Sequence, residues 1–189
     1  MAFYISYPTD DIYISEFFST QNFVSSPFLY TGEYTEHNKC PDAYRSLLKF
    51  NTTDIIPSKS FIEKVTLHLY VNRKDKTDYK HSSQCLTVYS NLINFSENTA
   101  TWNNAPNISI TPYSKTILNK DIGNYIQLDI TCLFLKWHDK IIANNGITLV
   151  GTENIIDTII GYGSSRSSNS PYLSIKYTYN TECQQYTQI

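Results

Sequence analysis

Histidine, cysteine and carboxylate side chains are the groups of this sequence that could carry chemistry, and their spacing fits none of the common reactive motifs. The four histidines are scattered, with no HExxH pair, and the chain contains no EF-hand loop, paired CxxC motif, P-loop or GxSxG motif. Glu97 is a candidate general acid, but a single glutamate among Asn and Thr residues more often orders a loop. We therefore expect no catalytic residue, no cofactor and no metal ion, and predict that the protein is not an enzyme.

The four cysteines lack metal-ligand spacing and permit three different intrachain pairings. Cys132 falls near the start of a predicted helix, on the side expected to pack, so we interpret it as a small buried hydrophobe. Cys85 begins a predicted strand, and its role stays open. Cys40 and Cys183 lie in polar segments, where we expect exposed thiols. These two are candidates for an inter-subunit disulfide, and the alternative is that both are unused thiols.

The length and composition predict a single domain over residues 1–189 that binds neither nucleic acid nor a membrane. The 21.8-kDa chain is long enough to bury a core without metal or disulfide support. Its net charge is -2, it has no long basic run, and no apolar run approaches the length of a membrane-spanning helix. Tyrosine occurs 16 times. Its rigid ring with a polar tip suits protein or sugar contacts, although tyrosine is also simply a good strand former.

The periodicity of apolar residues predicts an all-β fold, a jelly-roll-like antiparallel β-sandwich with one short α-helix. The clearest strand is 62–71, in which Val65, Leu67, Leu69 and Val71 share one face. Further strands are predicted at 2–7, 12–18, 28–31, 43–50, 85–93, 108–118, 124–130, 147–150, 155–162 and 172–179. Residues 8–11 are predicted to form a turn between the first two strands, and residues 33–42 an exposed loop.

Two tryptophans mark the predicted departures from strand structure. Apolar residues at three- and four-residue spacing predict a helix over about 131–144, with Trp137 buried against the sheet. Residues 95–106 are rich in Asn and Thr, which bond nearby backbone groups, and we predict that they form a long ordered crossover joining the two halves of the sandwich. Trp102 is expected to anchor this crossover in the core, while Asn103 and Asn104 bond backbone groups.

Six segments, in their order along the chain, resemble the DNRLRE-domain proteins, which are bacterial and archaeal surface β-sandwich modules. The segments are YRSLLKF (44–50), VTLHLY (65–70), ENTATWNNAP (97–106), DIT (129–131) followed by Trp137, NGITL (145–149) and SPYLSIKY (170–177). The resemblance covers nearly all of the chain from residue 10 to residue 177. Some members of this family are classed as carbohydrate-binding, so the resemblance implies a β-sandwich fold and a polysaccharide partner.

Two functions from different classes fit these observations, and the first is a self-assembling structural protein. It would be a subunit of a surface filament, spore appendage or coat layer, with other copies of itself as partners. The N-terminal residues 1–9 and the polar tail 180–189 would contact neighbouring subunits, and Cys40 and Cys183 would form disulfides between them. The N-terminus has no secretory signal. We therefore expect a spore or cell-surface location after lysis of the mother cell, or the cytoplasm if the protein does not assemble.

The second function is a carbohydrate-binding module that recognises a cell-surface or acidic polysaccharide, as the family resemblance implies. Arg45 and Lys49 project from one face of the same predicted strand, where they could meet the carboxylates of such a polymer. Two solvated strand charges are the alternative explanation for these residues. Assembly is the leading hypothesis from the sequence, and carbohydrate binding is the alternative.

Overall fold

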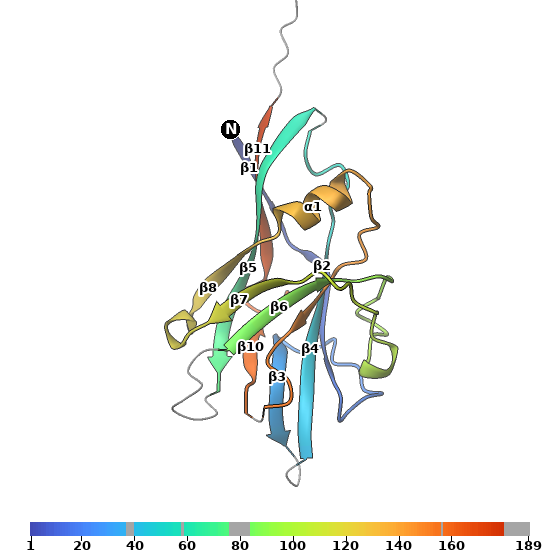
Figure 1. Cartoon of the computed structure of the whole chain (residues 1–189), viewed down its shortest axis with the longest axis vertical. Helices are drawn as coiled ribbons and strands as arrows, with labels where there is room; N and C mark the ends of the chain where they lie inside the picture. The colour runs from blue at the N-terminus through green and yellow to red at the C-terminus, as the bar shows by residue number, and fades with distance from the viewer. Residues whose placement is uncertain (37–39, 58, 76–83, 156, 180–189) are drawn as a thin grey trace, which may run out of the picture.

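The computed structural model describes residues 1–36, 40–57, 59–75, 84–155 and 157–179, which form a β-rich molecule with one α-helix (Figure 1). The strands are β1 (Ala2–Ser6), β2 (Pro8–Ser15), β3 (Phe28–Glu36), β4 (Cys40–Phe50), β5 (Ser60–Lys74), β6 (Gln84–Ser90), β7 (Tyr113–Ile117), β8 (Asn124–Asp129), β9 (Ile147–Val150), β10 (Ile160–Gly163) and β11 (Tyr172–Tyr179). The α-helix is α1 (Thr131–His138), and two short 3-10 helices are η1 (Trp102–Asn104) and η2 (Asn119–Asp121).

The strands form two layers, and the described strand pairs are antiparallel. One layer holds β1, β11, β5 and β8, and the other holds β2, β4, β9, β6 and β7. β10 pairs with β5 of the first layer and with β3, which pairs with β4 of the second layer. Hydrogen bonding therefore continues from one layer to the other, and the chain passes between them repeatedly, as in a jelly roll. The predicted all-β antiparallel sandwich is confirmed (Figure 1).

The main core lies between the two layers, and β5 supplies its centre. Val65, Leu67, Leu69 and Val71 are almost fully buried on the inner face, as the alternation predicts. They belong to one cluster of buried apolar side chains that comes from both layers and from α1. Burial of apolar surface contributes about 25 cal/mol per Å², so this cluster is the main source of stability for the fold.

The helix α1 covers one end of the sandwich and is shorter than the sequence predicts. Its inward residues are Leu133, Phe134 and Trp137, and the 5% exposure of Trp137 confirms the predicted burial. The helix ends at His138 instead of continuing to 144, because Lys140 adopts a left-handed φ of +58°. Ile141 fits the helical spacing in the sequence but is exposed to solvent. Within the described residues, no helix has the length and apolar character needed to cross a bilayer.

Several strand boundaries were predicted wrongly, because strand pairing overrides local composition. Residues 8–11, predicted as a turn, belong to β2, where a bulge between Pro8 and Asp10 accommodates the pairing with β4. The loop predicted for 33–42 is much shorter, since β3 continues to Glu36 and β4 already begins at Cys40. The strands predicted for 108–118 and 155–162 are reduced to β7 and β10. A partner strand satisfies backbone groups whatever the side-chain propensity, so the register decides these boundaries.

The central stretch 95–106 is not a crossover between the two layers. β6 before it and β7 after it pair with each other in the same layer, so the chain leaves and returns at neighbouring strands. The stretch folds over the outer face of β2 and β4 and closes a second, smaller core. This second core contains Ile12, Ile14, Leu47, Phe95 and Ala100. Trp102 packs half-buried against the second core, so it anchors the stretch outside the main core.

Candidate functional site

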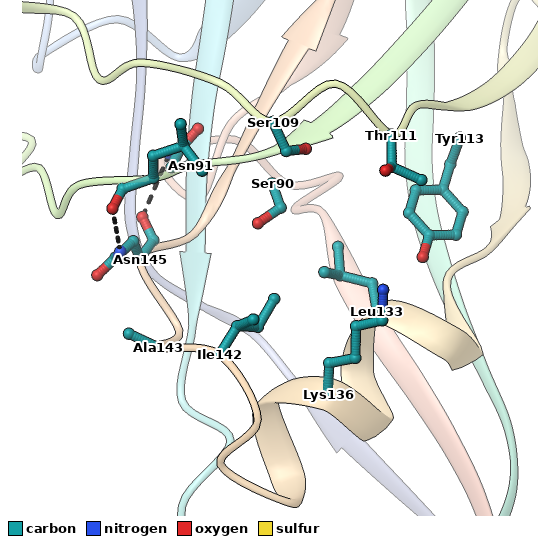
Figure 2. A pocket seen from close by; sticks show the side chains of 11 residues that line it. Ser90, Asn91, Ser109, Thr111, Tyr113, Leu133, Lys136, Ile142, Ala143 and Asn145 are labelled. Carbon is teal, nitrogen blue, oxygen red and sulfur yellow. Dashed lines mark hydrogen bonds between the residues drawn. The ribbon is translucent and has the colours of Figure 1, made fainter.

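A cleft of about 390 Å³ opens between α1 and the segments around β6 and β7 (Figure 2). Its walls come from α1, the turn after α1, the end of β6 and the chain that leads into β7. The lining residues are Ser90, Asn91, Leu92, Ser109, Thr111, Tyr113, Leu133, Lys136, Ile142, Ala143 and Asn145. Ligand clefts commonly measure about 300–1,000 Å³ and combine apolar walls with a few polar groups. This cleft has both properties.

Asparagine side chains hold one wall of the cleft in place. The Asn91 amide donates to the Asn145 carbonyl at 3.2 Å, and the Thr148 hydroxyl donates to Asn91 Oδ1 at 2.6 Å. The Asn145 amide donates to the Leu92 carbonyl at 2.9 Å. Gly146 follows with a φ of +84°, and a Cβ there would lie 2.5 Å from a backbone oxygen of β4. The two amides therefore shape the cleft, since most of their hydrogen-bonding capacity is used within the protein.

The rest of the lining presents polar groups to the cleft. The Ser109 hydroxyl is buried and has no hydrogen-bond partner within the described part of the chain. Burial raises the pKa of Tyr113, with smaller contributions from Cys132 and Asp129, so the phenol stays protonated and can donate a hydrogen bond at neutral pH. Figure 2 shows the Lys136 side chain rising from α1 toward the Tyr113 ring. Hydroxyls, a phenol and an ammonium group thus share one concave surface.

These groups suit the binding of a sugar better than the transformation of one. None of the eleven residues that line the cleft has a carboxylate, an imidazole or a thiol, the groups that most often act as acids, bases or nucleophiles. A sugar unit presents many hydroxyls, which both donate and accept hydrogen bonds, and patches of C–H bonds. Ile142 offers apolar contact for such patches, and the hydroxyls of the exposed Thr111 and the partly exposed Tyr113 offer hydrogen bonds.

Arg45 and Lys49, the predicted polysaccharide face, lie on the outer face of β4 and not in the cleft. Arg45 donates two hydrogen bonds to the Glu153 carboxylate, at 2.8 and 2.9 Å, and its guanidinium lies 4.8 Å from the Trp102 ring centroid. The hydrogen bond to Glu153 raises the pKa of Arg45. Lys49 donates to the Asn94 side chain at 2.6 Å. Arg45 thus contacts Glu153 and Trp102, and Lys49 contacts Asn94. The role of the two charges toward a polysaccharide stays a prediction.

Glu97 orders the central stretch, in agreement with its interpretation as a loop acceptor. Its carboxylate accepts a hydrogen bond from the Asp11 backbone at 2.9 Å and pairs with the Arg166 guanidinium at 2.7 Å. The same guanidinium lies 2.6 Å from the carboxylate of Asp11, a fully buried residue. We call Asp11, Glu97 and Arg166 the ion-pair clasp. In the described residues, no group of three or more His, Cys, Asp or Glu side chains is arranged to hold a metal ion.

The three described cysteines, Cys40, Cys85 and Cys132, are exposed free thiols. The predicted burial of Cys132 is therefore wrong. The inward face of α1 is formed by Leu133, Phe134 and Trp137, and position 132 falls outside that face. Cys40 begins β4 and does not lie in a loop. Cys183 and the tail 180–189 lie outside the described residues, so the inter-subunit disulfide stays a prediction.

The residues of the cleft were not singled out by the sequence. Thr111 and Tyr113 fall in a segment predicted only as a strand, and Lys136 looks like an ordinary solvated position of a helix. The three residues come from two segments that the fold brings together (Figure 2). The one sequence signal near them is Asn144-Asn145-Gly146, which predicts a turn after the helix but not a cleft beside it.

The chain thus folds as a β-sandwich module with a cleft of ligand size beside α1. The chain belongs to carbohydrate-binding module family 96, whose family model matches residues 2–177. No curated protein matches the chain. The family match supports the part of the resemblance that predicts a β-sandwich of the carbohydrate-binding type. It does not confirm that the chain is a DNRLRE-domain protein. It also favours the carbohydrate-binding alternative over the self-assembling structural protein.

Proposed function

We propose that this protein binds a polysaccharide, without cleaving it, through the cleft beside α1. The observation that carries the proposal is the match to a carbohydrate-binding family over residues 2–177. The cleft supports it by combining ligand-sized volume with hydroxyl, phenol and ammonium groups. Lys136 would favour an acidic polymer, because an ammonium group can pair with the carboxylate of a sugar acid.

In the proposed complex a sugar unit forms hydrogen bonds with the accessible groups of the cleft. Thr111 and Lys136 are exposed and Tyr113 is partly exposed, so their polar groups are within reach of a ligand. One sugar hydroxyl bonds the Thr111 hydroxyl, while Tyr113 donates to a second one. The exposed side chain of Ile142 contacts the C–H bonds of the ring.

Affinity electrophoresis tests the proposal, in native gels that contain hydroxyethylcellulose, xylan, galactomannan or polygalacturonate. We expect at least one polymer to retard the protein. Thr111→Ala combined with Lys136→Ala should weaken that binding about tenfold, since two hydrogen bonds of about 0.5–1.5 kcal/mol each are lost. Thr116→Ala combined with Lys120→Ala is the matched control, because both residues are exposed and outside the cleft. Migration unaffected by all four polymers, or equal weakening by both double variants, would contradict the proposal.

Self-assembly is a second candidate function, and the position of β1 favours it. β1 pairs with β11 of its own chain and ends the order of strands, so one of its hydrogen-bonding edges has no partner among the described strands. Phe3 and Ile5 on this strand are exposed. An unpaired apolar edge can add a strand from a second copy. Sedimentation velocity of the wild-type protein and of Ile5→Lys, each with and without reductant, tests for such an assembly. We expect an oligomer in the wild-type sample that is absent from the Ile5→Lys sample.

A further inference from the structure

The accessible polar side chains of the cleft beside α1 lie together on one wall. Figure 2 shows Thr111, Tyr113 and Lys136 on one side of the cleft and Ile142 and Ala143 on the other. Thr111 and Lys136 are exposed and Tyr113 is partly exposed, so their polar groups are open to a ligand. We call Thr111, Tyr113 and Lys136 the donor wall, because a hydroxyl, a phenol and an ammonium group can all donate hydrogen bonds.

The opposite wall of the cleft is aliphatic. Leu92 and Ile142 line it with exposed fractions of 58% and 37%, and Ala143 is exposed as well. The Leu92 carbonyl accepts a hydrogen bond from the Asn145 amide, which places Leu92 beside the turn that carries the other two residues. We call Leu92, Ile142 and Ala143 the aliphatic wall. Core packing does not account for side chains that are open to solvent, whereas apolar side chains exposed in a cleft are typical of a ligand contact.

Lys136 of the donor wall lies next to Ile142 of the aliphatic wall. The Ile142 backbone N–H donates to the Lys136 carbonyl at 3.2 Å, so the two side chains start from neighbouring points of the chain. An ammonium group has three donors and no acceptor. A ligand group that contacts both residues therefore needs an oxygen that accepts a hydrogen bond and an alkyl part beside it. A hydroxyl or a carboxylate of a sugar offers the oxygen without the alkyl part.

We propose that the cleft recognises an O-acetyl group on the polysaccharide. The carbonyl oxygen of the acetyl ester accepts a hydrogen bond from the Lys136 ammonium group, and the methyl group contacts Leu92 and Ile142. The carbonyl oxygen and the methyl group are bonded to the same carbon atom, so a single acetyl group reaches both walls. At about 390 Å³ the cleft has room for the acetyl group together with the sugar unit that carries it.

This inference rests on the proposed function and adds the chemical feature that the cleft selects. Thr111 and Tyr113 bond the hydroxyls of the sugar unit, and the remaining donors of Lys136 can still pair with the carboxylate of an acidic polymer. Removing the acetyl group from the polymer abolishes both the apolar contact and the hydrogen bond to the carbonyl. An O-acetylated polymer should therefore bind about tenfold more tightly than the same polymer without acetyl groups.

Isothermal titration calorimetry with paired polymer samples tests the inference. The polymer that retards the wild-type protein most in affinity electrophoresis is partially O-acetylated, and half of the batch is then deacetylated with dilute alkali. Leu92→Thr combined with Ile142→Thr makes the aliphatic wall polar and should reduce the ratio of the two affinities from about tenfold to about threefold. Ile93→Thr combined with Ile141→Thr is the matched control and should keep the ratio, because these exposed neighbours do not line the cleft. Thermal melts confirm that each variant is folded.

Three outcomes would overturn the inference. Wild-type affinity that is equal for the two samples, or higher for the deacetylated one, would refute selection of the acetyl group and leave the proposed function standing. A ratio that Leu92→Thr with Ile142→Thr leaves unchanged, or that the control lowers equally, would show that the aliphatic wall does not contact the acetyl group. A wild-type protein that binds none of the polymers would instead overturn the proposed function and the inference together.

Discussion

His68 shows how a single residue on the outer face of a strand becomes part of the folded interior. The alternation along β5 directs it away from the main core, yet it is only 8% exposed, because the Tyr172 ring covers it. Its Nδ1 atom is buried with no hydrogen-bond partner within the described residues. Burial of this kind disfavours the charged imidazolium and lowers the pKa of His68 below its usual 6.5.

The lowered pKa predicts that His68 destabilises the protein in mild acid. In the unfolded chain His68 binds a proton near pH 6.5, whereas in the folded state it resists protonation to a lower pH. Its contribution to the free energy of unfolding is therefore complete above pH 6.5 and falls as the pH drops toward the folded-state pKa. Melting temperatures measured between pH 7.5 and pH 5 should fall less for His68→Gln than for the wild-type protein. His138→Gln, at an exposed position of α1, should keep the wild-type pH dependence.

At the scale of one element, α1 is stabilised by its contact with the sandwich and not by its own length. It has only eight residues, its N-cap residue Ile130 has no polar side chain, and Asp129 Oδ1 accepts a hydrogen bond from the Thr131 backbone N–H at 2.9 Å. An isolated helix of this length would not be stable in water. Leu133, Phe134 and Trp137 bury its inner face in the main core. Because α1 also supplies a wall of the cleft, the packing of this face positions the proposed binding site.

Trp137→Ala should therefore lower the free energy of unfolding by about 3–5 kcal/mol, the usual cost of truncating a large aromatic side chain in a core. The indole N–H is buried without a partner among the described residues. Trp137→Phe removes this unsatisfied donor and keeps most of the apolar contact, so its cost should be clearly smaller. Urea denaturation of both variants measures the difference. Equal stability of Trp137→Ala and the wild-type protein would contradict the burial of this face.

The central stretch gives a second prediction at the scale of an element, because its two neighbouring asparagines have different roles. Asn104 accepts a hydrogen bond from the Thr101 backbone at 2.7 Å and donates to the Thr99 carbonyl at 2.9 Å. Asn103 contributes its backbone N–H, which donates to the Ser19 carbonyl at 3.1 Å, while its side chain is exposed. The structure thus confirms the expected side-chain bonds to the backbone for Asn104, whereas Asn103 takes part through its own backbone N–H.

Asn104→Ala should loosen the stretch, whereas Asn103→Ala should not. In hydrogen exchange we expect faster exchange of the Thr101 and Asn103 amides in Asn104→Ala, with little change in β5. Asn103→Ala is the matched control, since it removes the same side chain one residue away. Exchange that accelerates equally in β5 and in the stretch would mean that the substitution destabilises the whole fold instead of one element.

At the scale of the whole molecule, the ion-pair clasp joins three segments that are distant in sequence. Asp11 lies on β2, Glu97 in the central stretch and Arg166 in the loop between β10 and β11. The Asp11 carboxylate also accepts hydrogen bonds from the backbone N–H and the hydroxyl of Ser165, at 2.6 and 2.5 Å. These contacts join β2 and the loop between β10 and β11 to the central stretch, which covers the second core.

Arg166→Ala should destabilise the protein by about 3–5 kcal/mol, because it leaves the buried Asp11 carboxylate without its cation. Arg73→Ala is the control. It removes the 2.6 Å ion pair between Arg73 and Asp75, in which both side chains are partly exposed, and it should lower the free energy of unfolding by at most about 1 kcal/mol. Chemical denaturation measures both. A loss of stability for Arg166→Ala no larger than for Arg73→Ala would show that the clasp is no stronger than a surface salt bridge.

The sequence by itself determined the fold class, most strands and the burial of Trp137, because each of these depends on local periodicity. The alternation in 62–71 predicts the inner face of β5, and β9 (Ile147–Val150) and β11 (Tyr172–Tyr179) begin and end at the predicted residues. The end of α1 was missed, because the left-handed backbone at Lys140 leaves no signal in the spacing of apolar residues.

Only the tertiary structure decided which strands are neighbours, and for this reason the stretch 95–106 covers the second core instead of forming the expected crossover. The same tertiary arrangement brings Tyr113 and Lys136 to one cleft. Long-range register carries no local pattern, so surfaces built from several segments could not be predicted from the order of residues alone.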